Sequence, residues 1–106
     1  MFTTDQRRLD LQTLLESQVG TGVKVYFQPP ASIQMAYPCV VYHRDQADTV
    51  FADNIPYRFT QRYQVTVIDR DPDSDIRAKI SSLPQCLYNR HFSADNLNHD
   101  VYVLYF

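Results

Sequence analysis

The chain has 106 residues, a length usual for a single domain, and its 44% apolar and 21% charged residues exclude wholesale disorder. A formal net charge of −2 excludes a global basic field for nucleic acid. No apolar run approaches the roughly 20 residues of a membrane helix, and residues 1–5 lack the pattern of a secretion signal. We therefore expect a protein that is cytoplasmic at synthesis, with Cys39 and Cys86 as reduced, buried thiols.

Residues 5–19 are predicted to form a helix, which Thr3 or Thr4 can cap. Its apolar stripe has helical spacing and consists of Leu11, Leu14 and Leu15, continued by Gln18, with Leu9 just beside it. The only two glycines, Gly20 and Gly22, fall where this helix should stop. Their position leaves no glycine-rich phosphate loop elsewhere, which excludes Walker-type and dinucleotide-binding sites.

Two short strands are predicted next, at 23–27 and 39–44, with a loop at 31–37 between them. The second strand is apolar without alternation, which is typical of burial on both faces. The segment 45–53 is polar around an apolar centre at Val50 and Phe51. We interpret it as a loop or short edge strand that leads into an Asp53-Asn54 turn.

The strongest pattern covers 57–68, where apolar and polar residues alternate strictly. One parity holds Tyr57, Phe59, Tyr63, Val65 and Val67, with Gln61 as its only polar member, and the other holds Arg58, Thr60, Arg62, Gln64 and Thr66. The alternation predicts a long antiparallel strand with one apolar and one polar face. At about 3.3 Å per residue the strand would reach roughly 36–40 Å, so we expect part of it to project as a hairpin arm.

A second helix is predicted to start at Asp71-Pro72, with Asp71 as its cap. Its helical stripe would hold Ile76, Ile80, Leu83 and Leu87, with Pro84 ending or kinking the helix. A closing hairpin is predicted from 88–94 and 101–106 around the turn 95–98. The predicted fold is one α+β domain over residues 1–106, a mostly antiparallel sheet flanked by two helices with a long projecting hairpin.

Polar clusters in the sequence match no catalytic or metal motif. The alternating aspartates of 69–75 resemble a calcium loop, but Ser74 and Ile80 stand where such a loop has Gly and Glu, which favours a helix cap. His91 and His99 could face each other across the last hairpin, with Cys86 or Asp95 completing a zinc set, but the spacing is not that of a zinc site. No Gly-x-Ser-x-Gly elbow is present.

The arginine face of 57–68 is the best candidate for binding nucleic acid. However, the alternation places Arg58 and Arg62 on the face opposite Tyr57 and Tyr63, so stacking and charge do not share one surface. We expect a solvated or interface-facing strand instead.

Several local runs resemble the small tail-completion and tail-terminator proteins of siphophages. They are Val23-Lys24-Val25-Tyr26-Phe27, Tyr37-Pro38-Cys39-Val40-Val41-Tyr42, Phe51-Ala52-Asp53-Asn54, and the polar-aromatic run RYQVTVIDRDPDSD from Arg62 to Asp75. Their order, between a short first helix and a closing aromatic strand, carries the resemblance over nearly the whole chain.

The resemblance implies a homo-oligomer, a hexameric ring at the head-proximal end of the tail, assembled in the host cytoplasm. Its partners would be the major tail tube protein and the head-tail connector or neck protein, with DNA only passing through the lumen and no membrane involved. It implies no catalysis, no cofactor and no metal. The candidate subunit or tube contact comprises Val50, Phe51, Tyr57, Arg58, Phe59 and Arg62. The main alternative is a neck or stopper protein of the head-tail interface; a small enzyme and a regulatory binding module also stay open.

Overall fold

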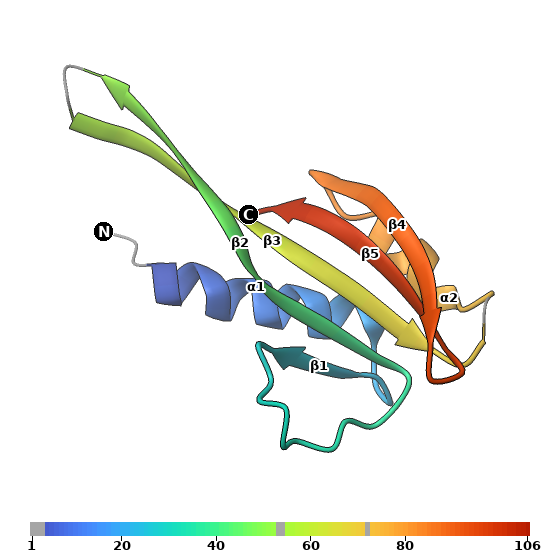
Figure 1. Cartoon of the computed structure of the whole chain (residues 1–106). Coiled ribbons are helices and arrows are strands. Elements are labelled where there is room, and N and C mark those ends of the chain that lie inside the picture. Colours follow the sequence, from blue (N-terminus) through green and yellow to red (C-terminus); the bar gives the residue numbers. More distant parts are fainter. Residues whose placement is uncertain (1–3, 53–54, 72) are drawn as a thin grey trace.

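The computed structural model of the chain contains two helices and one five-stranded sheet (Figure 1). It describes residues 4–52, 55–71 and 73–106, and at 4–5, 46–52 and 55–60 the backbone alone. The elements in chain order are α1 (Thr4–Val19), β1 (Lys24–Phe27), β2 (Cys39–Ala52), β3 (Ile55–Asp69), α2 (Asp75–Ser81), β4 (Cys86–Ala94) and β5 (Leu97–Tyr105). The predicted α+β class is confirmed.

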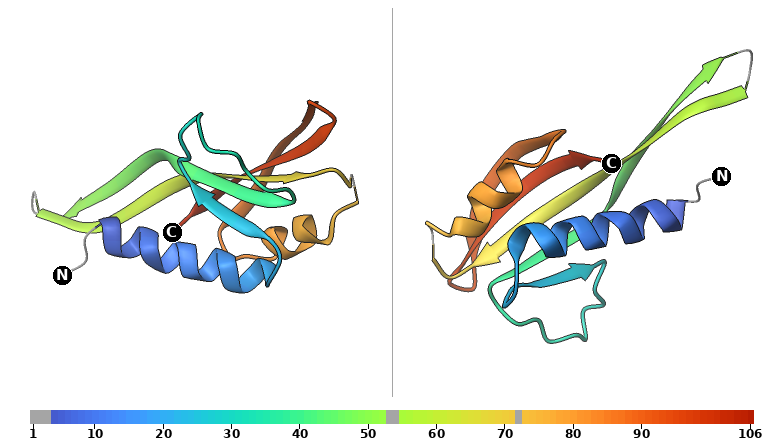
Figure 2. Two further views of the ribbon diagram at one scale, coloured as in Figure 1. Left: turned by 90° about the horizontal axis from the view of Figure 1, so that it is seen from below. Right: turned by 180° about the vertical axis from the view of Figure 1, so that it is seen from behind.

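The sheet has the strand order β1-β2-β3-β5-β4 and is antiparallel except for the parallel pair β1–β2. Both helices lie on one face of this sheet, as Figure 2 shows. The main buried side chains between helices and sheet are Leu11, Leu15, Val19, Val40, Tyr42, Tyr63, Val65, Val67, Ile76, Ile80, Tyr102 and Leu104. Within the described part of the chain, β4 adds only the half-buried Cys86 to this core.

α1 packs on the sheet through the leucine stripe that the sequence predicts. Leu11 and Leu15 are fully buried, and Leu14 is half-buried against the same core. Leu9, just beside the stripe, is 47% exposed. The predicted helical face is therefore confirmed.

The first helix also ends where the glycines predict. α1 stops at Val19, and Gly20 follows with a φ of 79°, in the left-handed region that glycine enters without a Cβ penalty. The Gly20 N–H donates to the Glu16 carbonyl at 3.1 Å and closes the last turn. At the other end Thr4 is already helical, and the alternative cap Thr3 lies outside the described residues.

The alternation along β3 is confirmed where its side chains are described. Tyr63, Val65 and Val67 face the helices, and each is at most 1% exposed, whereas the intervening polar residues are half-exposed. Gln61, the polar member of the apolar parity, is 6% exposed and donates from Nε2 to the Arg62 carbonyl at 3.0 Å. A buried amide is thereby given a hydrogen-bond partner.

Of the two interpretations of 45–53, the loop is wrong and a strand is correct, because β2 continues to Ala52 as one long strand. The predicted Asp53-Asn54 turn lies outside the described residues. The pairing register of β2 and β3 shifts between Arg44 and Gln46, which leaves Asp45 as an extra residue in β2. Such a β-bulge bends and twists a strand without ending it. The polar composition at this point therefore marks a bulge, not a strand end.

Beyond the bulge, β2 and β3 pair only with each other among the described residues (Figure 1). β1 pairs with β2 no further than Tyr42, and β5 pairs with β3 from Arg62 onward. The backbones of 47–52 and 55–61 thus form a two-stranded extension of the sheet. A projecting arm stays a prediction.

The predicted start of the second helix at Asp71 is wrong, because α2 begins at Asp75. Ser74 is the N-cap, and its Oγ accepts a hydrogen bond from the Ile76 N–H at 3.3 Å. The Asp69 and Asp71 carboxylates each accept the N–H two residues further on, at 3.0 and 2.9 Å. These consecutive Asx turns satisfy the backbone locally and move the cap three residues along the chain, from Asp71 to Ser74.

The second helix is also shorter than its apolar spacing predicts. Ile76, Ile80 and Leu83 are buried, but α2 ends at Ser81, ahead of Pro84. Leu87, the last member of the predicted stripe, lies in β4 instead and is 63% exposed.

The closing hairpin is confirmed, with a tighter turn than predicted. Asp95 and Asn96 alone connect β4 to β5, and their φ values are 54° and 63°. Positive φ at both central residues is the signature of a type I′ turn, whose twist matches that of the flanking strands. Leu97 and Asn98 therefore belong to β5.

Gln12 of α1 binds one backbone carbonyl at the outer edge of β1. Because the Gln28 N–H donates to the Tyr42 carbonyl in the parallel pair, the alternation of β1 turns the Val25 carbonyl away from β2. Gln12 Nε2 donates to this carbonyl at 3.2 Å, and Gln12 Oε1 accepts from the Tyr42 hydroxyl at 2.5 Å. One side chain thus satisfies an edge carbonyl and a buried phenol together.

The buried tyrosines predict a loss of stability at alkaline pH. Desolvation raises the pKa of both Tyr42 and Tyr63 above the ordinary value of 10.0. The folded chain therefore holds these protons where the unfolded chain loses them, so the free energy of unfolding falls as pH rises above about 10. Urea unfolding at about pH 8 and about pH 11 measures the loss. Tyr63→Phe should reduce it; an unchanged pH dependence would contradict the assignment.

Candidate interaction surface

β4 is an edge strand, and no strand of the described part of the chain pairs with its outer side. Of its nine residues eight are exposed, although β5 pairs with it along its length. Three of the exposed side chains are large and apolar: Leu87 at 63%, Tyr88 at 53% and Phe92 at 40% exposed. Apolar edge strands invite pairing with another chain, so uncovered ones mark interaction sites. We call Leu87, Tyr88, Arg90 and Phe92 the β4 surface; Tyr88 lies on the helix-facing side of the strand, and the other three lie on the opposite side.

A β-bulge sets the direction of these side chains. The register shifts between Tyr88 and Arg90, and after the shift Phe92 lies opposite His99 of β5. The Phe92 and His99 rings stack at 4.5 Å between centroids and 11° between planes. The Arg90 guanidinium lies 5.8 Å from the Phe92 ring centroid, within the range of a cation–π contact. The exposed ring is therefore held in one orientation.

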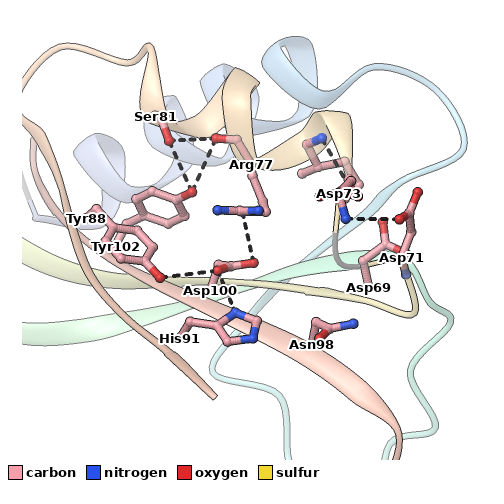
Figure 3. A network of polar contacts seen from close by, with 12 residues as sticks. Asp69, Asp71, Asp73, Arg77, Ser81, Tyr88, His91, Asn98, Asp100 and Tyr102 are labelled. Carbon is pink, nitrogen blue, oxygen red and sulfur yellow. Dashed lines mark hydrogen bonds and ion pairs between the residues drawn. The ribbon is translucent and has the colours of Figure 1, made fainter. Parts of the chain in front are cut away.

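On the helix-facing side, a single buried carboxylate ties β4 to its neighbours (Figure 3). Asp100 of β5 is 2% exposed. Its Oδ2 lies 3.2 Å from Nε of Arg77 on α2, and its Oδ1 lies 2.9 Å from Nδ1 of His91 on β4. The Tyr88 hydroxyl donates to the same Oδ1 at 3.5 Å. Asp100 thus joins α2, β4 and β5.

The same joint continues through Tyr102. Its hydroxyl accepts from Ser81 Oγ at 3.1 Å and donates to the Arg77 carbonyl at 3.3 Å (Figure 3). The Tyr88 and Tyr102 rings meet edge to face, with centroids 5.4 Å apart. An open depression of about 530 Å³ between α2 and β4 is lined by Asp73, Ser74, Arg77, Ala78, Ser81, Tyr88 and Tyr102. The hydroxyl of Tyr102 thus joins β5 to α2.

Of the residues predicted to form the contact, the structure describes the side chain of Arg62. Its guanidinium lies 3.0 Å from the Asp45 carboxylate, at the bulge in β2. A hydrogen bond with Tyr105, followed by the charge of Asp45, raises the pKa of Arg62. Arg62 on β3 therefore contacts Asp45 of β2 and Tyr105 of β5, at the point where the two-stranded extension begins.

The other predicted contact residues are Val50, Phe51, Tyr57, Arg58 and Phe59. Their side chains lie outside the described part of the chain. Their backbones belong to the two-stranded extension, 47–52 and 55–61, with which neither β4 nor β5 pairs.

The suggestion that His91 and His99 face each other is wrong. Their cross-strand neighbours are Asp100 and Phe92, so the two imidazoles lie on opposite faces of the hairpin. Among the residues that the structure describes, no three His, Cys, Asp or Glu side chains gather as a metal site would require.

The two cysteines are free thiols on different strands. Burial raises the pKa of Cys39 to about 11, helped by the nearby Asp69 carboxylate, and burial alone raises the pKa of Cys86 to about 11. Thiolate is the reactive form, so both side chains are poor nucleophiles near neutral pH.

Sequence reasoning missed both the β4 surface and the Asp100 joint. The spacing of Leu87 from Ile80 and Leu83 fits a helix, so the sequence predicts it in a helical stripe. Two signals in the sequence could have found the site. One is a run of nine residues, 86–94, with Leu87, Tyr88 and Phe92 but no acid. The other is a lone acid, Asp100, directly before the apolar run 101–106.

Within the described part of the chain, no helix has the length and apolar character needed to cross a membrane. No protein-family model matches the chain, and no curated protein matches its sequence.

Proposed function

We propose that this chain is a structural virion protein, a tail terminator that forms a ring at the head-proximal end of a phage tail tube. The ring stops polymerisation of the tube and provides the docking surface for the head connector. The observation that carries the proposal is the β4 surface, an exposed apolar strand at one edge of the sheet. A ring subunit needs such a surface, because each copy must bind its neighbour.

The polar chemistry of the chain supports a structural role. Asp100, the most buried acid among the described residues, is used to join three elements. The two thiols are held in their unreactive form by burial. The fold, a mostly antiparallel sheet with helices packed on it, agrees with what the resemblance to tail terminators implies.

Electron microscopy of a phage that lacks this protein tests the proposal. Because terminator binding competes with addition of the next tube ring, its loss removes the stop. We expect filled heads, no joined virions, and tails that are aberrant or overlong. Adding the purified protein to the lysate should cap the tubes and restore joining to heads.

Two other outcomes would change the assignment. Tails of normal length that fail to join heads would favour the neck or stopper protein, because such a protein acts after the tube is complete. Complete, infectious particles would contradict both structural roles.

A further inference from the structure

We infer that an arginine cluster, Arg7, Arg8 and Arg44, binds the aspartate segment, Asp69, Asp71, Asp73 and Asp75, of a second copy of this chain. The inference deepens the proposed ring and rests on that proposal for the identity of the partner. It assigns a basic site and an acidic segment to the contact between neighbouring copies.

Aromatic rings hold the three arginines at one place between α1 and the sheet. The guanidinium carbons of Arg8 on α1 and Arg44 on β2 lie 4.6 and 5.0 Å from the centroid of one ring, that of Phe27 on β1. The Arg7 guanidinium carbon lies 4.7 Å from the Phe106 ring centroid. Contacts of this length are cation–π contacts, which fix the position of each charge. Each arginine keeps part of its surface exposed.

The charges of the arginine cluster converge on one buried group. Burial raises the pKa of Tyr63, and the charges of all three arginines act in the opposite direction. Residues 6–12, which carry two of these arginines, contain one acid, Asp10, so the cluster and Asp10 together have a net charge of +2. Asp45, at the bulge in β2, pairs with Arg62 at 3.0 Å. Such a concentration of positive charge attracts an acidic partner.

The aspartate segment is the complementary feature. Residues 69–75 contain four aspartates and one arginine, a net charge of −3, and no other run of seven residues in the sequence has as much negative charge. Asp71, Asp73 and Asp75 are exposed, and Asp69 is half-buried. Opposite charges on two surfaces steer association and fix which parts of the partners meet.

One chain cannot form this contact with itself. Arg44 lies opposite Tyr63 in the pairing of β2 with β3, and Asp69 follows six residues later on β3. At about 3.3 Å per residue these positions are about 20 Å apart, whereas an ion pair needs about 4 Å. The segment between β3 and α2 lies at the end of the sheet away from the start of α1 (Figure 1). The partner is therefore another molecule.

The aspartate segment is continuous with the β4 surface. Asp73 and Tyr88 line the same open depression between α2 and β4. An acidic part and an apolar part of the surface thus lie side by side. A second copy that binds the aspartate segment therefore also comes close to the β4 surface, on which the proposed function is based.

The arginine cluster and the aspartate segment are different parts of the chain, so the contact is heterologous. Each copy gives its aspartate segment to one neighbour and receives that of another at its arginine cluster. Repeated contacts of this kind close into a ring when the rotation between copies divides a full turn.

Sedimentation of two variants, alone and mixed, tests the contact. Arg8→Glu changes the basic site, and Asp71→Asn with Asp73→Asn halves the number of aspartates in the segment but keeps the side-chain oxygen of the Asx turn at position 71. Each variant alone should self-associate about tenfold more weakly than the wild type, or less. In the mixture, the intact segment of the first variant still meets the intact site of the second, so we expect one-to-one pairs and no larger assemblies.

A matched control and three outcomes decide the test. Lys79→Glu reverses an exposed charge on α2, outside the arginine cluster, and should not weaken association. An asparagine variant that associates as the wild type does would overturn the inference, and this variant decides the matter if Arg8→Glu does not fold. A mixture of folded variants that forms no pairs, or a wild-type chain that is monomeric at every concentration tested, would overturn it as well.

Salt and DNA distinguish the acidic segment from other partners. Raising the salt concentration from about 0.1 to about 1 M shortens the screening length from about 10 to about 3 Å and should weaken self-association. Association that does not respond to salt would contradict the contact. Binding of duplex DNA that Arg8→Glu abolishes, with self-association at the wild-type level, would assign the cluster to nucleic acid instead.

The outcomes separate this contact from the function. Rings that depend on Arg8 but do not cap tail tubes would contradict the proposed function and support the contact. An Arg8→Glu variant that caps tubes as well as the wild type would contradict the contact and support the function.

Discussion

Asp100→Ala is expected to lower the free energy of unfolding by about 2–3 kcal/mol. The carboxylate forms an ion pair with Arg77 and hydrogen bonds with His91 and Tyr88, and its removal takes this shared partner from all three. Breaking a fully buried pair costs about 3–5 kcal/mol, but the Arg77 and His91 side chains are 39% and 41% exposed and keep part of their hydration. Because these two side chains are partly exposed, we expect the loss of unfolding free energy to be at or below the lower end of the range for a fully buried pair.

Urea unfolding compared with Asp10→Ala measures this effect. Asp10 is exposed and accepts one hydrogen bond from Gln6, at 3.1 Å, so its removal should change the stability by less than about 0.5 kcal/mol. Asp100→Asn keeps the shape of the side chain but not its charge, and should fall between the two. An Asp100→Ala variant as stable as Asp10→Ala would show that the joint contributes little to the fold.

The elements that sequence predicts best are those with a sustained period. The leucine spacing of α1 and the alternation along β3 each place several side chains on one face, so a single misleading residue does not change the pattern. The end of α1 was predictable because Gly20 adopts a backbone conformation that disfavours other residues.

The elements predicted wrongly depend on local hydrogen bonds that have no period. The sequence does not show whether Asp71 caps the helix or forms an Asx turn, because an Asp side chain can do either. In the structure Asp71 forms the Asx turn, and Ser74 is the helix N-cap. At Asp45 the extra residue of a bulge has the same polar signature as the start of a loop.

The candidate surface was missed because it depends on contacts between distant segments. Leu87 has helical spacing in sequence, and its exposure follows from its place on β4, at the edge of the sheet and on the face opposite the helices. In the same way, the partners of Asp100 come from α2 and β4, 23 and nine residues earlier in the chain. Pair contacts of this kind follow from topology, which one sequence does not determine.

Leu15→Ala is expected to lower the free energy of unfolding by about 2–5 kcal/mol, the usual cost of truncating a fully buried leucine. Leu15 is fully buried between α1 and the sheet, so the substitution removes apolar contacts and leaves a cavity that the strands cannot close without moving. Leu9→Ala removes the same atoms from the same helix at a site that is 47% exposed, and should cost less than about 1 kcal/mol. For a domain of this size the difference corresponds to roughly 10 °C in the melting temperature. Thermal unfolding of the two variants side by side measures it. Similar melting temperatures would mean that α1 does not pack on the sheet through Leu15, and the position of both helices on one face would have to be revised.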